Sequence, residues 1–313
     1  MTCSQGWKTV VFAQASASSP PTFTAASDIQ DVVSENMQIV DSLQGNEQVI
    51  RGRRDRIVQT VALGGIAVGG TLSMLLNYKR LGFWLKAATG TASSPYIQTE
   101  ALLPHGIGVK RATSSYLRSY SGCLVDTLTI AGSEGGPITA DVSLIGKTYT
   151  DTVATTTVPT YTAVDYSSGG WAPFMFSAAT LTVNGGAIGI QGFSLEINNH
   201  LSPSALNNVF VTDICSEDFS VMLSVTSKAG DLYNALYDNT SGGTGKGKPG
   251  SEPAMVLTLT HASGTMVATM PKWSFPRAEG GTNGRGTIQT TFSGECLADA
   301  GLSPAQAISI AVT

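Results

Sequence analysis

The side chains best suited to chemistry are three histidines and four cysteines, and their spacing forms no recognisable site. His105, His200 and His261 lie far apart, and none belongs to H-E-x-x-H or a similar metal-binding pattern. The cysteines are scattered as well: Cys3, Cys123, Cys215 and Cys296. None lies within four residues of another, so the sequence has no C-x-x-C metal or redox motif. We expect small buried thiols in a reducing compartment, with disulfide formation left open, and we predict no metal site and no cofactor.

Two stretches approach the phosphate-binding pattern G-x-x-x-x-G-K-[ST] without completing it. Gly146-Lys147-Thr148 matches its end, but Asp141 stands where the first glycine belongs. Residues 242–248 fit the glycine and lysine spacing, but Pro249 follows them. The Gly-rich stretch 241–250 is therefore interpreted as a hairpin loop. The sequence also has no G-x-S-x-G nucleophile elbow, and we predict no catalytic residue and no enzymatic activity.

Charge is divided unevenly along the chain. Residues 1–125 carry 11 basic and 7 acidic groups, or +4, whereas residues 126–313 carry 7 basic and 15 acidic groups, or −8. A chain polarised in this way can stack end to end with its copies, or present one sign of charge to a lumen. The densest basic cluster consists of four arginines: Arg51, Arg53, Arg54 and Arg56. We interpret it as a solvated loop or a subunit contact to carboxylates, with a nucleic-acid contact as the alternative.

The composition indicates a chain built mainly from β-strands. Only 13% of the 313 residues are charged, against about 25% in an average protein, while 42% are apolar and 35 are glycine. This balance excludes a solvated helical protein, which needs Glu and Lys faces, and it excludes high-charge disorder. The net charge of −4 gives no sign of tight nucleic-acid binding. What remains is a Gly-, Thr- and Ser-rich chain of strands and turns.

One apolar stretch resembles a membrane span. Residues 57–78 carry no charged residue, follow the arginine cluster and contain Gly65-x-x-x-Gly69. Polar residues are spread through the stretch, however, and its two Gly-Gly pairs predict turns or bulges between short strands. The apolar run at residues 10–13 is too short for a signal peptide. We therefore predict no membrane segment.

The most informative pattern is an internal repeat of a strand, a helix and a hairpin. In the first half, the strand at 70–77 precedes a helix with Leu81, Trp84, Leu85 and Ala88 on one face and Gly90 at its end. In the second half, the strand at 219–226 precedes Leu232, Ala235 and Leu236 at the same spacing, with Gly242 as the stop. The two strands are matched through Met74-Leu75 and Met222-Leu223.

Each predicted helix is followed by a predicted β-hairpin. Alternating strands flank Glu134-Gly135-Gly136 in the first half, ending at Gly146, and flank Glu279-Gly280-Gly281 in the second, ending at Gly294. A further hairpin is predicted around Asn184-Gly185, between 181–183 and 193–197. We divide the chain into an N-terminal arm and loop (1–56), a first unit (57–147), a linker or small insertion (148–177) and a second unit (178–313).

Three stretches resemble the tail tube, or major tail, proteins of long-tailed bacteriophages with non-contractile tails. The first is Arg51-Gly52-Arg53-Arg54, leading into residues 67–73 and the helix at 81–88. The second is Tyr120-Ser121-Gly122-Cys123-Leu124-Val125, leading into the strand at Leu128. In the third, residues 174–199 are similar to that family's Ala-Thr-Leu-Thr-Val-Asn-Gly hairpin and Phe-Ser-Leu-Glu-Ile-Asn-Asn strand. With the repeat, the resemblance reaches about residue 296.

The resemblance implies a mainly β fold with two tandem β-sandwich or barrel units, each with a short flanking α-helix, joined into a ring-forming sheet. It implies a structural virion subunit, made in the host bacterial cytoplasm, whose stacked rings form the hollow conduit for DNA ejection. Two units favour trimeric rings with pseudo-six-fold symmetry, with a hexamer as the alternative. Further implied partners are the tail terminator, tail tip and tape-measure proteins.

An acidic lumen repels DNA phosphates and lets DNA slide without sequence-specific binding. Glu196, in an alternating strand, is the first candidate for a lumen-facing acid, followed by Asp126 and Asp141. The four clustered arginines are candidates for inter-subunit contacts. The alternatives are another phage structural or adhesive β-protein (tail tip, fibre or capsid decoration) and a carbohydrate-active β-sandwich enzyme. The enzyme would need a cleft with facing carboxylates and aromatic side chains.

Overall fold

Strands dominate the part of the chain that the computed structural model describes, which confirms the mainly β fold. The described residues are 9–15, 23, 29–45, 61–111, 116–153, 170–204, 208, 210–228, 252–274, 289–302 and 304–313. They form a thirteen-stranded sheet, a six-stranded sheet and a two-stranded ribbon. The predicted second helix, the Glu279-Gly280-Gly281 turn, the arginine cluster and Cys3 lie outside these residues.

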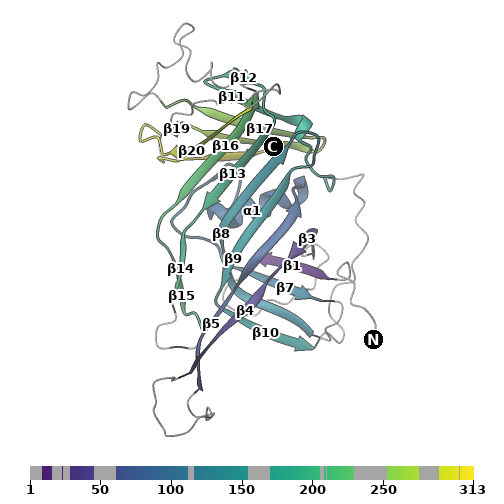
Figure 1. The fold of residues 1–313 in the computed structure, drawn as a ribbon, viewed down its shortest axis with the longest axis vertical. Helices are drawn as coiled ribbons and strands as arrows, with labels where there is room; N and C mark the ends of the chain where they lie inside the picture. Colours follow the sequence, from purple (N-terminus) through teal and green to yellow (C-terminus); the bar gives the residue numbers. More distant parts are fainter. Residues whose placement is uncertain are drawn as a thin grey trace.

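Eight strands of the thirteen-stranded sheet lie side by side and form the central sheet of the molecule (Figure 1). In spatial order they are β3 (Val32–Glu35), β5 (Val61–Leu75), β9 (Thr139–Gly146), β8 (Tyr116–Ser133), β13 (Gly192–Asn198), β16 (Ser220–Lys228), β20 (Gln289–Leu297) and β19 (Lys272–Ser274). Every neighbouring pair is antiparallel. Because β8 pairs with β13, strands from both halves of the chain share one continuous sheet.

The two halves of the central sheet have the same strand order. In the first half β8 and β9 form a hairpin, and β9 folds back onto β5. In the second half β19 pairs with β20, and β20 folds back onto β16. The residue match proposed for β5 and β16 is wrong, however, because Met74 is buried whereas Met222 is exposed. A shift of one residue along a strand turns every side chain to the opposite face.

Four strands pair with the N-terminal half of β8 or with one another to form a second layer in the first half of the chain. They are β1 (Val10–Ala15), β2 (Ile29–Gln30), β7 (His105–Lys110) and β10 (Thr148–Val153). β1 lies within the residues assigned to the N-terminal arm and loop, and there Val11 and Phe12 are fully buried and β1 pairs with β7. β8 belongs to both layers. It bends near Gly122, which has a φ of 64°, and near a register shift between Val125 and Thr127.

The six-stranded sheet forms the second layer of the other half. Its order is β12 (Gly186–Ile188), β11 (Ala179–Val183), β17 (Met255–His261), β18 (Gly264–Met270), β21 (Ser309–Val312) and β6 (Tyr96–Ile97). The turn at Asn184-Gly185 is confirmed, with φ of 47° and 83°, which suits a two-residue hairpin. The predicted return strand is wrong. β11 returns as β12, and residues 193–197 instead lie in β13 between β8 and β16.

The helix α1 (Tyr78–Thr89) confirms the prediction made from Leu81 to Gly90. The Asn77 side chain accepts a hydrogen bond from the Arg80 N–H at the N-terminus, and Gly90 adopts the left-handed conformation at the C-terminus. Leu81, Trp84 and Leu85 are buried in a core cluster that extends through both halves of the chain. The helix therefore fills the space beside the central sheet.

β5 is one strand of fifteen residues that passes through both Gly-Gly pairs, so the predicted turns between short strands are wrong there. Its partner β4 (Gln38–Gly45) carries the register shift instead, between Asp41 and Leu43. Among the described residues, no helix is long and apolar enough to cross a membrane. In the sequence, β13 and β16 are connected through a two-stranded ribbon of β14 (Leu201–Ser204) and β15 (Asp213–Ser216). This ribbon packs beside the lower end of β5 (Figure 1).

Candidate functional site

The central sheet has one buried face and one partly exposed face. On β9 the side chains of Ala140, Val142 and Leu144 are buried, whereas those between them are half-buried. The same alternation runs through β13. The second face, which we call the open face, is rich in hydroxyl and carboxyl groups. It includes Ser73, Thr127, Thr129, Asp141, Ser143, Ser194, Glu196, Asn198, Ser220, Ser224, Ser293 and Glu295.

One residue from each of the eight strands lies in a line across the open face, which we call the transverse row. From β3 to β19 its members are Ser34, Ser73, Asp141, Thr129, Glu196, Met222, Glu295 and Ser274. Three carboxylates therefore stand on alternate strands. Because neighbouring strands are about 4.8 Å apart, successive carboxylate positions are about 10 Å apart along the row.

This spacing decides what the carboxylates can do. At about 10 Å, roughly one Debye length, their fields overlap, yet the groups are too far apart to share a proton or one small cation. Consistent with this, the described residues contain no group of three His, Cys, Asp or Glu placed to hold a metal ion. The row is therefore a line of negative charge on a hydroxyl-rich surface.

The structure places the three predicted acids differently. Glu196 and Asp141 belong to the transverse row. Asp126 lies at the bend of β8, where its Oδ1 accepts a hydrogen bond of 2.8 Å from the Leu201 N–H and anchors the start of β14. Sequence reasoning missed Glu295, because the predicted strand ended at Gly294. The alternation of β20 continues to Leu297 and would have included it.

The histidines and cysteines occupy separate environments. His105 is fully buried with its ring edge-on to Phe83, and burial lowers its pKa to about 4. The His200 ring lies 2.9 Å from the Ser220 hydroxyl, and His261 packs beside Phe174. The three described cysteines are free. Burial raises the pKa of the Cys123 and Cys296 thiols to about 12, as expected for inert core residues.

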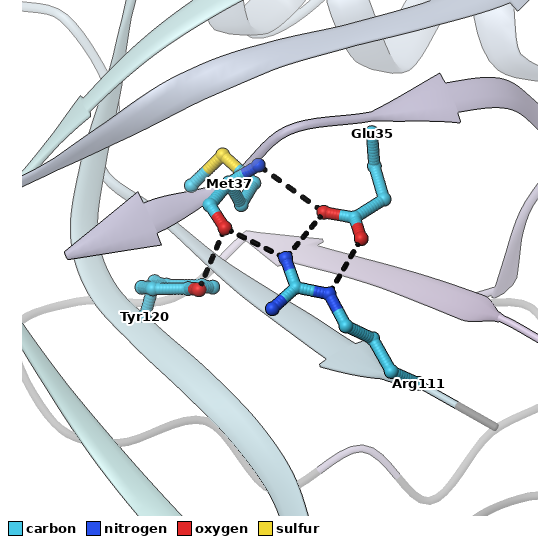
Figure 2. A network of polar contacts seen from close by, with 4 residues as sticks. All are labelled: Glu35, Met37, Arg111 and Tyr120. Carbon is cyan, nitrogen blue, oxygen red and sulfur yellow. Dashed lines mark hydrogen bonds and ion pairs between the residues drawn. The ribbon is translucent and has the colours of Figure 1, made fainter. Parts of the chain in front are cut away.

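The two edges of the central sheet are β3 and β19. Among the described residues, β3 pairs only with β5, and β19 pairs only with β20. The β3 edge is held in place by four residues from three parts of the chain: Glu35, Met37, Arg111 and Tyr120 (Figure 2). Of these four, the sequence patterns pointed only to Tyr120, as the first residue of a stretch that resembles the tail tube family.

A long antiparallel sheet with a hydroxyl-rich, acidic open face, and with two edges that pair with no further strand among the described residues, is typical of a structural β-protein. The model of a family described as phage tail tube protein matches residues 8–296. The chain belongs to this family. It is a structural subunit of a bacteriophage tail tube and a component of the virion tail, where such subunits assemble into stacked tubes through which DNA is ejected. No curated protein matches the chain.

Proposed function

We propose that this chain builds a tail tube of the non-contractile, siphovirus type from trimeric rings in which each chain supplies two tandem units. The observation that carries this proposal is the shared strand order, β5–β9–β8 in one half and β16–β20–β19 in the other. The proposed units are residues 57–147 and 178–313, with an arm before them and a linker at 148–177. The alternative is a hexamer.

The even number of strands in the central sheet supports closure into a ring. Eight strands alternate in direction, so β19 of one copy runs antiparallel to β3 of the next, as β8 runs antiparallel to β13 within the chain. Three copies supply 24 strands. At about 4.8 Å per strand this gives a circumference of about 115 Å and a diameter of about 37 Å, before strand tilt widens it. Barrels of about 16–18 strands already enclose an aqueous channel.

In this ring the open face lines the lumen. Asp141, Glu196 and Glu295 then recur in each of three chains and form a closed line of nine carboxylates. Negative charge repels the DNA phosphates, and the surrounding hydroxyl groups offer no cationic partner, so DNA passes without being held. Arg51, Arg53, Arg54 and Arg56 are proposed to contact carboxylates of a neighbouring subunit. They lie outside the described residues.

The role proposed here is structural and without catalysis. Each carboxylate of the transverse row is separated from the next by an intervening strand, which is unlike the facing pair that a glycosidase needs. The tail terminator, tail tip and tape-measure proteins are the further partners proposed. Each meets the tube at an end or within the lumen.

Negative-stain electron microscopy of the purified protein, before and after concentration, tests the proposal. We expect rings or hollow tubes with three-fold or pseudo-six-fold symmetry, and native mass spectrometry of single rings should give three chains. Six chains per ring would replace the trimer by the hexamer. Particles that remain monomeric at every concentration would contradict ring formation and favour a tail-tip or decoration protein instead.

A further inference from the structure

The edge of the central sheet at β3 is one long strand interrupted by two residues. β3 and β4 both pair with β5, and Asn36 and Met37 lie between them. The Asn36 N–H donates to the Thr71 carbonyl at 3.1 Å, so the pairing with β5 continues through the interruption. A β-bulge of this kind usually turns an edge away from further pairing.

Met37 is fixed at this interruption from every side. Its side chain is fully buried, and its N–H donates to Glu35 Oε2 at 3.1 Å. Its carbonyl accepts hydrogen bonds from Arg111 Nη2 at 2.9 Å and from the Tyr120 hydroxyl at 3.1 Å (Figure 2). Across the sheet it meets Gly70, where an added Cβ would lie 2.6 Å from the Met37 Cα. The N–H and the carbonyl of Met37 therefore both have hydrogen-bond partners, and the close approach of Gly70 confines the Met37 backbone.

Arg111 joins this edge to the second layer. Its Nε donates to Glu35 Oε1 at 2.8 Å and its Nη2 to Glu35 Oε2 at 3.1 Å, a two-pronged pair that also raises the pKa of Arg111. The Glu35 side chain is only 10% exposed. Arg111 directly follows β7, and Tyr120 belongs to β8. Contacts from the second layer and from β8 thus hold the edge strand β3 in its position.

We propose that Glu35, Arg111 and Tyr120 are positioning residues that hold β3 in the geometry needed to pair with β19 of a second copy. The inference rests on the proposed ring. β3 has four residues and pairs with one strand among those described, and Val33 is 70% exposed, so its own contacts fix it weakly. Glu35, Arg111 and Tyr120 supply this restraint by hydrogen-bonding the backbone of the bulge at Met37. The edge of β3 that faces away from β5 is then left for a partner strand.

The test compares two arginine–carboxylate pairs of the same geometry. Arg111→Lys keeps the charge at the edge but loses the two-pronged hydrogen bond. The matched control is Arg118→Lys, because Arg118 makes an equivalent pair with Asp151 between β8 and β10, at 2.7 and 2.8 Å. Each full-length protein is tested for urea unfolding, and its critical concentration for assembly is measured by sedimentation and electron microscopy.

We expect Arg111→Lys to fold and to raise the critical concentration about tenfold, as when the pairing-competent state falls to about a tenth of the molecules. Arg118→Lys should assemble like the wild type. Raising the protein concentration should restore normal rings of Arg111→Lys, and hydrogen exchange at residues 32–35 of its unassembled subunit should be faster than in the wild type. A merely structural pair would not move that local exchange.

Equal critical concentrations for wild type and Arg111→Lys would overturn the inference and leave the ring proposal standing, as would equal losses in both arginine variants. If Arg111→Lys fails to fold, Tyr120→Phe is the deciding variant, because it removes one hydrogen bond to the Met37 carbonyl and keeps the aromatic side chain. In that variant, unchanged assembly argues against positioning and weakened assembly supports it. A wild-type protein that never forms rings removes the ring proposal and this inference together.

Discussion

Glu196 on β13 and Glu295 on β20 lie at the same level of the central sheet, with Met222 of β16 between them. Two strand registers produce this alignment, and five more extend the row across all eight strands. The two glutamates are distant in sequence, and Asp141 joins them from the other half of the chain. Charge that is dispersed in the sequence is thus gathered into one line.

Reversing this line of charge should make the tube hold DNA. With Asp141, Glu196 and Glu295 all replaced by Lys, each chain presents three cations on the open face. We expect assembled tubes to retain short duplex DNA at low salt and to release it as salt increases, because phosphate neutralisation releases counterions. Filter retention of labelled DNA over a salt series measures the effect.

Glu217→Lys is the control for that experiment, because Glu217 is exposed and lies between β15 and β16, outside the row. Tubes of this variant should release DNA like the wild type. If the triple variant forms tubes that retain no more DNA than Glu217→Lys, the open face does not line the lumen.

Acid should destabilise the subunit through His105. The pKa of about 4 in the folded protein lies below the ordinary value of 6.5, so the unfolded chain takes up the proton first. The contribution of His105 to the free energy of unfolding is therefore constant above pH 6.5 and falls as pH drops from 6.5 towards 4, by about 3 kcal/mol for the whole window. Urea unfolding between pH 7.5 and 4 should show this loss, and His105→Leu should flatten the curve. An equally steep curve for His105→Leu would assign the loss to other groups.

Gly70 is required for space. A methyl group there would meet the Met37 backbone at 2.6 Å, so Gly70→Ala should destabilise the subunit by about 1–3 kcal/mol through overpacking. Gly136→Ala is the control, because the nearest atom to its new Cβ lies at 3.6 Å. The midpoints of urea unfolding should differ between the two variants. Equal midpoints would mean that the segment at Asn36 and Met37 can move away from β5 without cost.

Trp84 should contribute through its volume and not through its indole N–H. The side chain is 1% exposed, and its buried Nε1 has no hydrogen-bond partner among the described residues. Trp84→Ala should cost about 3–5 kcal/mol, whereas Trp84→Phe, which loses only part of the ring, should cost much less. Thermal unfolding of both variants gives the comparison, with Lys79→Ala on the exposed face of α1 as the control. Similar losses for Phe and Ala would reveal a polar role for the indole.

Local patterns predicted the elements whose contacts are local. The helix from Leu81 to Gly90 and the hairpin around Glu134-Gly135-Gly136 follow from periodicity, a cap and a turn within a short stretch. Periodicity also indicates that Glu196 and Asp141 alternate with buried residues. These are statements about faces, and a single strand carries that information in its own sequence.

The partners of a strand depend on residues elsewhere in the chain, and local patterns predict them less well. Nothing in residues 193–197 tells that they pair with β8 and β16 in preference to β11. β1 has six residues and depends on β7 and β2 for its pairing, so its short apolar run does not by itself indicate a strand. The transverse row is set by bulges such as that at Asp126, which shift register by one residue without a distinct signal.

β8 spans eighteen residues, and its N-terminal half belongs to the second layer whereas its C-terminal half belongs to the central sheet. Two layers that touch only through side chains can slide over each other under load. A strand common to both layers carries tension along covalent bonds, so a force on the central sheet passes into the second layer through the backbone of β8. The two layers of each subunit are therefore coupled by the chain itself and not by side-chain packing alone.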